Sequence, residues 1–129
     1  MNMEYGYKRK VGMSYDNALK KLREELPGEG FGVLTEIDVK ATLKKKLDVD
    51  FDKYIILGTC NPPFAYQALQ AEKDIGLLLP CNIIVYEDAG EVYISAIVPT
   101  VAMSMVDNEK LSGVAVAVEA KLKKVIDTI

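Results

Sequence analysis

The sequence contains no histidine and no tryptophan, and only two of its 129 residues are cysteines. Histidine is the commonest general base near neutral pH and the commonest zinc ligand. Its absence excludes serine triads, Cys-His pairs and zinc or iron sites built on histidine. Any proton transfer would therefore use a carboxylate, a lysine, or a tyrosine such as Tyr54 or Tyr66.

Long apolar segments are also missing. No apolar run reaches the roughly 18 residues that a membrane helix requires. The first ten residues carry charges where a signal peptide would have its apolar segment. We therefore expect a cytoplasmic protein with no membrane partner, in which both cysteines are thiols.

The remaining composition is that of a globular domain. Half of the residues are hydrophobic, 27% are charged, and the formal net charge is −3. This length suits one core, so residues 1–129 are predicted to form a single domain.

Hydrophobic periodicity predicts the element order β-α-β-α-β-α-β-β-α. Ser14 and Asp38 are expected to cap the first two helices, and the turn 88–90 to join the two strands of a hairpin. The expected strands are 5–11, 30–37, 53–60, 81–87 and 91–98, and the expected helices are 14–26, 38–47, 61–72 and 107–129. Together they favour an α+β fold with a mainly antiparallel sheet packed on helices, with a parallel doubly wound sheet as the alternative.

Three predictions concern burial. The strand 53–60 is apolar on both faces, which is typical of a central strand. Val39, Leu43 and Leu47 are expected to form the buried stripe of the second helix. The segment 75–79 is interpreted as a buried connector, and 99–106 as an apolar loop of unresolved structure.

Cys60 is the first candidate for chemistry, because it lies at a strand end just before the helix that Asn61 and Pro62 begin. Helix N-termini stabilise a thiolate, so such a cysteine can be nucleophilic without histidine. The alternative is that Cys60 is a small apolar core residue.

Cys81 is the second candidate, since it follows Pro80 and precedes Asn82. If both cysteines meet at one edge of the sheet, they can form a reversible disulfide or offer two ligands to a soft metal. Met103 and Met105 could add thioether ligands, although methionines in an apolar loop are more often packing residues. We predict no bound cofactor and no defined metal site.

The third candidate is the group Glu36, Asp38 and Lys40 at a strand-to-helix junction. Two carboxylates on one side of a strand can bind a cation or transfer protons. The alternative is that Asp38 caps the helix and Glu36 is solvated or paired with a lysine.

Nucleic acid is not an expected partner. The basic run 40–46 is short, the chain is acidic overall, and no recognised nucleic-acid motif is present. The glycines at 28, 30 and 32 do not match a nucleotide-binding fingerprint.

Three segments, 35–47, 56–63 and 78–82, together resemble the family called domain of unknown function three hundred and two. The resemblance implies a compact α+β domain of the TATA-binding-protein-like or helix-grip class that often dimerises, and it implies no reaction. It also implies that one site is built from these motif residues: Glu36, Asp38, Lys40, Cys60, Asn61, Pro62, Pro80, Cys81 and Asn82.

The cysteines, the other motif residues and the apolar loop 99–106 are compatible with three functions. The first is a thiol-dependent redox or sulfur-handling role, with Cys60 as nucleophile and Cys81 as resolving partner. The second is a non-catalytic module that binds a small molecule or soft metal, with Glu36, Asp38, Lys40, Asn61 and Asn82 as further ligand-binding residues and the loop 99–106 as cover. The third is a homodimeric interaction module that uses this loop and the last helix. The thiol role is slightly preferred.

Overall fold

The computed structural model describes residues 4–129. Within this range the strands form one five-stranded antiparallel sheet in the order β1-β5-β4-β3-β2. The strands are β1 Gly6–Val11, β2 Gly32–Asp38, β3 Tyr54–Cys60, β4 Cys81–Asp88 and β5 Glu91–Ile97. The α+β prediction and its element order are confirmed, and the parallel alternative is wrong because every strand pair is antiparallel.

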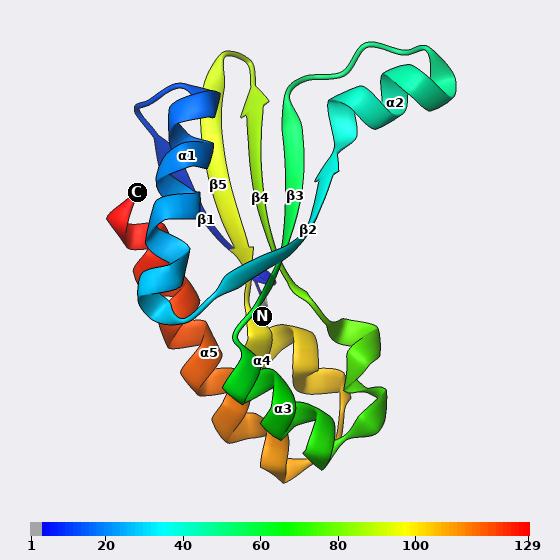
Figure 1. The fold of residues 1–129 in the computed structure, drawn as a ribbon, viewed down its shortest axis with the longest axis vertical. Helices are drawn as coiled ribbons and strands as arrows, with labels where there is room; N and C mark the ends of the chain where they lie inside the picture. Colours follow the sequence, from blue (N-terminus) through cyan, green and yellow to red (C-terminus); the bar gives the residue numbers. More distant parts are fainter. Residues whose placement is uncertain (1–3) are drawn as a thin grey trace.

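The helices lie in two groups around this sheet (Figure 1). Helices α1 and α5 lie along the sheet, and α3 and α4 gather at its lower end with the lower part of α5. The bounds are α1 Tyr15–Glu25, η1 Leu26–Glu29, α2 Val39–Leu47, α3 Pro62–Ala71, η2 Lys73–Leu78, α4 Pro99–Ala102, η3 Met103–Met105 and α5 Glu109–Thr128.

The core lies between the sheet and helices α1 and α5. Ser14 caps α1 by accepting a hydrogen bond from Asn17 N at 3.1 Å. The helix then buries one stripe that includes Leu22, while α5 buries residues such as Leu122 at the same spacing. Each fully buried leucine contributes about 1.5–3 kcal/mol relative to an exposed one.

The β4–β5 connection is the predicted tight hairpin. Asp88 pairs with Glu91, which leaves Ala89 and Gly90 as a two-residue turn. Both have positive φ, 51° and 81°, as the favoured two-residue hairpin turn requires.

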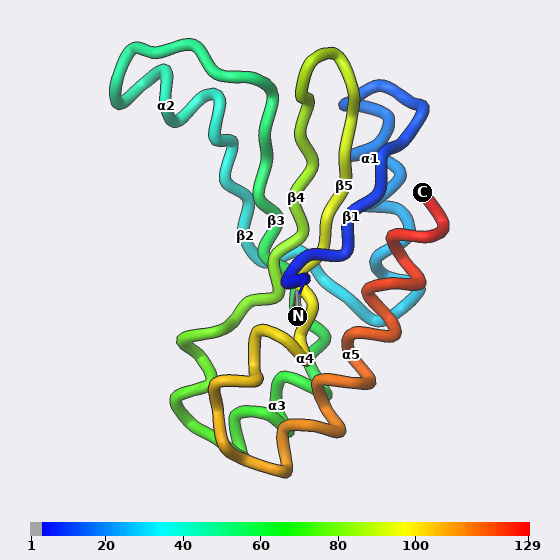
Figure 2. The backbone as a smooth tube through the Cα atoms, turned by 180° about the vertical axis from the view of Figure 1, so that it is seen from behind, coloured from blue at the N-terminus to red at the C-terminus, as the bar shows by residue number. Residues whose placement is uncertain are grey.

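Helix α2 differs from its prediction. It extends away from the rest of the molecule on an arm that continues β2 (Figures 1 and 2). None of its residues is buried, and Leu47 is 66% exposed. The stripe of Val39, Leu43 and Leu47 has the right spacing, but only Val39 and Leu43 are half-buried, because the arm lies outside the core.

Two other segments are more structured than predicted. The connector 75–79 is mostly the 3-10 helix η2, in which Ile75 is buried but Leu77 is 87% exposed. The segment 99–106 contains α4 and η3 rather than an irregular loop. Strand β3 is internal, as its sequence indicated, but β4 occupies the centre of the sheet.

Candidate functional site

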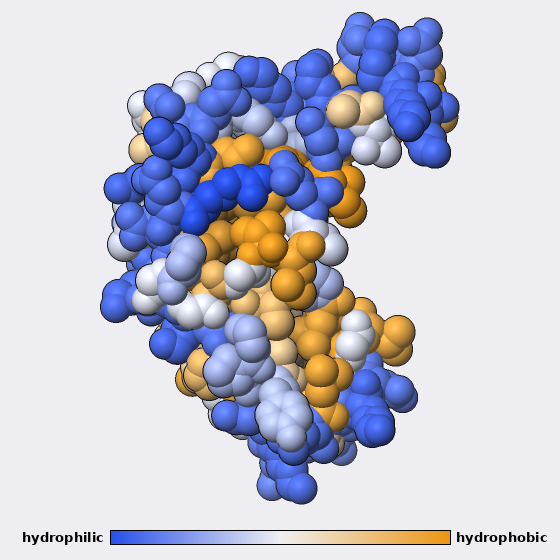
Figure 3. All heavy atoms as spheres, viewed as in Figure 1, coloured by the Kyte–Doolittle hydropathy of each residue, from blue (hydrophilic) through white to orange (hydrophobic). Residues whose placement is uncertain are grey.

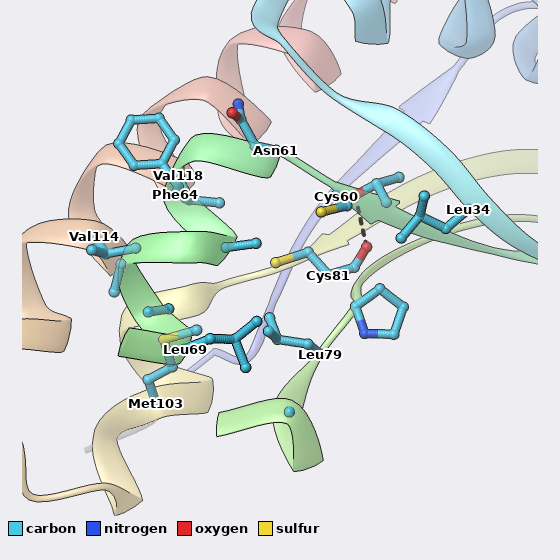
Figure 4. Close-up of a pocket in the computed structure, with 16 residues that line it drawn as sticks. Leu34, Cys60, Asn61, Phe64, Leu69, Leu79, Cys81, Met103, Val114 and Val118 are labelled. Atoms are coloured by element: carbon cyan, nitrogen blue, oxygen red, sulfur yellow. Dashed lines mark hydrogen bonds between the residues drawn. The ribbon is translucent and has the colours of Figure 1, made fainter. Parts of the chain in front are cut away.

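Cys60 and Cys81 lie at the same end of the sheet. Cys60 is the last residue of β3, Cys81 is the first residue of β4, and Cys81 pairs with Thr59 in the register of the two strands. Both are half-buried, both are free thiols, and both line one pocket. Their sulfur atoms point into the same cavity (Figure 4). The structure therefore brings the two predicted thiols together.

This pocket, which we call the strand-end pocket, has a volume of about 350 Å³. It lies between the sheet end, helices α3 and α5, and the segments η2 and η3. Its remaining walls are mainly aliphatic, with one aromatic ring. The lining residues are Leu34, Thr59, Cys60, Asn61, Phe64, Ala65, Ala68, Leu69, Gly76, Leu79, Pro80, Cys81, Met103, Val114, Ala115 and Val118.

The two most polar lining side chains already have partners within the protein. The Thr59 hydroxyl donates to the Cys81 carbonyl at 2.7 Å, and the Asn61 amide donates to the Glu29 carbonyl at 3.0 Å. Figure 4 shows the Asn61 amide turned away from the two sulfurs. Asn61 does precede α3, as predicted, but its side chain ties the helix to η1 instead of capping it. None of the lining residues within 4–129 is charged.

A β-bulge forms part of the pocket rim. Val33 pairs with Thr59 and Thr35 pairs with Gly58, so Leu34 is an extra residue in β2. A bulge redirects the side chain of the residue that it inserts. Leu34 is 66% exposed yet lines the pocket, so this apolar side chain lies at its opening. The space-filling view shows hydrophobic side chains gathered in the hollow between the α2 arm and the lower helices (Figure 3).

Close packing beside the thiols requires a glycine at position 58. A Cβ atom built there would overlap the Thr35 hydroxyl and lie 2.7 Å from Pro80 Cγ. Gly58 thus lets Pro80, which lines the pocket, pack against β3.

The environment of Cys81 favours its neutral form. Burial, together with a smaller contribution from the neighbouring Cys60, raises the pKa of this thiol from 9.0 to about 11. Cys81 is therefore protonated near neutral pH, which makes it a weak nucleophile and a neutral part of the wall.

The carboxylate group lies elsewhere, at the base of α2. Glu36 is 2.8 Å from Arg23 in an ion pair, and Asp38 caps α2 by accepting from Ala41 N at 3.0 Å. Lys40 donates to the Phe51 carbonyl at 2.7 Å. Asp38 and Lys40 line a separate surface depression of about 290 Å³. The structure does not bring this group to the cysteines.

Asn82 is exposed and is not part of the pocket lining. Side chains alternate along a strand, so Asn82 points to the sheet face opposite that of Cys81. Of the two predicted methionines, Met103 lines the pocket and Met105 is 75% exposed. Across residues 4–129, no three side chains of histidine, cysteine, aspartate or glutamate are grouped to hold a metal ion.

Sequence reasoning missed most of the pocket wall. Phe64 on α3 and the pair Val114 and Val118 on α5 are apolar residues of amphipathic helices, and core residues give the same sequence signal. The one sequence signal for a cavity was the pair of small residues Ala65 and Ala68 on α3, because small side chains leave room beside a helix.

Comparison with known proteins identifies the family of this chain. The family model "Domain of unknown function DUF302" matches residues 7–129. The chain belongs to the DUF302 family. The three segments in which the sequence resembled this family all lie within the match.

A solved DUF302 structure has the same fold. It is the crystal structure of an uncharacterized conserved DUF302 protein from Bacillus stearothermophilus, with 31% sequence identity and a TM-score of 0.91. The similarity covers 97% of this chain and 98% of that one. No curated protein matches the chain significantly. Within the part of this DUF302 protein that the structure describes, no helix is both long enough and apolar enough to cross a membrane.

Proposed function

We propose that this DUF302 protein binds a small, uncharged, apolar ligand in the strand-end pocket. The observation that carries the proposal is a hollow of about 350 Å³ with aliphatic and aromatic walls, to which the described part of the chain contributes no charged side chain. Ligand pockets in proteins are mostly apolar and start at about 300 Å³.

The pocket's polar atoms support this choice of ligand. Thr59 and Asn61 donate to carbonyl groups of the protein, and the Cys81 thiol is neutral near pH 7. A charged ligand would lose its hydration here and find no opposite charge, which costs on the order of several kcal/mol. An apolar ligand loses nothing of this kind and gains about 25 cal/mol per Å² of buried apolar surface.

Titration with an environment-sensitive apolar dye tests the proposal. We expect saturable binding with one site per chain and displacement by neutral aliphatic molecules. Ala65→Phe should weaken binding at least tenfold, because Ala65 lines the pocket on α3 and a larger ring would occupy its space.

Gln67→Phe provides the matched control. Gln67 is exposed on the same helix and is not part of the lining, so the same substitution there should leave the affinity unchanged. Equal affinities for wild type and Ala65→Phe, both folded, would contradict the proposal.

A thiol-dependent role is the second candidate, favoured by the shared position of Cys60 and Cys81. Two-electron oxidation by a peroxide would convert the two thiols to one disulfide and reduce the peroxide to water or an alcohol. After treatment with mild hydrogen peroxide, a thiol assay should detect neither cysteine, and mass spectrometry should show a mass lower by two hydrogen atoms. The Cys60→Ser variant should not form the intramolecular disulfide. Two thiols that survive this treatment would exclude the role.

The homodimer stays a prediction. Met105 and Val116 are exposed on the surface first expected to form it, and the unburied helix α2 offers a second surface. Light scattering at tens of micromolar protein measures the mass, and a comparison of Met105→Glu with Leu47→Glu identifies the interface. We expect a dimer, and a monomeric mass for wild type would contradict this.

A further inference from the structure

A second hollow adjoins the strand-end pocket. It has a volume of about 190 Å³ and lies between α4, η3 and α5. Met103 and Ala115 line both hollows, so these two side chains form a shared wall. Figure 4 places Met103 on the opposite side of the pocket from Leu34, which lies at the rim. The wall is therefore the far end of the pocket.

Met103 is the movable part of this wall. Ala115 has no side-chain torsion that could open a passage, whereas methionine is unbranched and adapts to irregular spaces. Met103 is only 9% exposed, so its side chain is held between the two hollows and is not in solvent.

The second hollow, like the first, offers no charged side chain of residues 4–129 to a ligand, although it is more polar. Among the described residues no charged side chain lines it, and three of its four polar side chains have partners within the protein. The Thr100 hydroxyl donates to Glu119 at 2.6 Å, Asn108 donates to the Ala71 carbonyl at 2.8 Å, and Ser104 donates to the Val101 carbonyl at 2.6 Å.

We propose that Met103 sets the maximum length of the ligand, and that the ligand is a linear, uncharged aliphatic molecule that enters beside Leu34 and ends at Met103. This inference rests on the proposed function. At about 30 Å³ per water-sized group, the first pocket holds roughly a dozen such groups. The second hollow adds about half as much volume again once the wall is removed.

The test measures affinities for straight-chain 1-alkanols from hexanol to hexadecanol by displacement of the apolar dye. Affinity for wild type should rise about fourfold per added methylene and stop rising at a cut-off length. Met103→Ala should move this cut-off to longer chains by several methylenes. Met103→Leu keeps the side-chain volume and should leave the cut-off in place.

A double variant tests the route through the wall. Ser112 is exposed and lines only the second hollow, so Ser112→Phe fills that hollow from its rim. Combined with Met103→Ala, it should return the cut-off to the wild-type length. If Met103→Ala does not fold, Met103→Val removes less volume and should produce a smaller shift in the same direction.

The two hypotheses fail differently in this experiment. A cut-off that is identical in wild type and in the folded Met103→Ala or Met103→Val variant would overturn the role of Met103 and leave the binding function intact. If no alkanol of any length binds wild type, the proposed function itself fails.

Discussion

Burial controls the acid–base chemistry of Cys81. Its pKa is raised to about 11, mainly by desolvation and further by the adjacent Cys60. A nucleophilic cysteine must be a thiolate, whereas a neutral thiol behaves as a small apolar side chain and suits an apolar wall. The local environment therefore favours ligand binding over nucleophilic attack by this residue.

The raised pKa predicts a loss of stability at alkaline pH. The unfolded chain releases the Cys81 proton around pH 9.0, whereas the folded protein holds it to about pH 11. The unfolded state then binds fewer protons, so the free energy of unfolding is highest below pH 9 and falls as the pH rises toward 11. Urea denaturation at a series of pH values measures this slope.

Cys81→Ala is the control for this slope. Burial also raises the pKa of Tyr15, from 10.0 to about 12, and adds a loss of the same sign at higher pH. The comparison therefore uses the interval from pH 9 to 10, where Cys81 dominates. A slope that Cys81→Ala leaves unchanged in this interval would show that burial of the thiol is not its cause.

Gly58 is predicted to be intolerant of any side chain. Its Cβ position is occupied by Thr35 and by Pro80, so Gly58→Ala forces the β2–β3 packing apart. We expect a destabilisation of about 1–3 kcal/mol in chemical denaturation. Gly32→Ala is the matched control on β2, because nothing lies within 4 Å of its Cβ position, and it should change stability far less. Equal effects would contradict the packing explanation.

At the scale of the element, the β4–β5 hairpin contains a removable strain. Ala89 has a φ of 51°, a left-handed conformation that costs an L-residue with a side chain about 1–2 kcal/mol. Ala89→Gly removes this cost but adds chain entropy to the unfolded state, so we expect a net stabilisation of about 0.5–1 kcal/mol. Gly90→Ala introduces the same strain and should destabilise. Thermal unfolding of both variants measures the two signs, and a destabilising Ala89→Gly would contradict this account.

Elements whose rules are local were predictable. Ser14 and Asp38 are caps that the sequence shows directly, and Gly90 marks the hairpin turn by supplying one of its two positive-φ residues. Helix α2 shows the limit of such rules. Its apolar spacing is real, but burial depends on a neighbouring surface, and within residues 4–129 that surface leaves Val39 and Leu43 half-buried and Leu47 exposed.

The segment around Leu34 was unpredictable for a related reason. A bulge inserts one residue without any composition signal, and the simple alternation of β2 fails at that point. The face assigned to each side chain of β2 therefore depends on the pairing with β3, which the sequence does not display.

At the scale of the whole molecule, the sheet order explains why only part of the site could be anticipated. The sequence analysis left open whether Cys60 and Cys81 share one edge of the sheet, and they do so because β3 and β4 are adjacent and antiparallel. The carboxylate motif was expected at the same site, but β2 carries it to the other end of the sheet and onto the α2 arm. Motifs that resemble one family can thus belong to separate parts of its fold.

The pocket itself belongs to this largest scale. Its walls come from β2, the β3–β4 end, α3, η2, η3 and α5, which are distant along the chain. Most wall residues are apolar, and each of these looks like a core residue in its own segment. Only the assembled fold shows that the space between them is not filled.

A crystal structure of the protein with a neutral aliphatic alcohol, such as decanol, tests the central claim most directly. The account predicts one extended ligand in the strand-end pocket, in contact with Phe64, Cys81 and Val118 and directed toward Met103. An empty pocket at a saturating alcohol concentration, or ligand bound only at other surfaces, would contradict it.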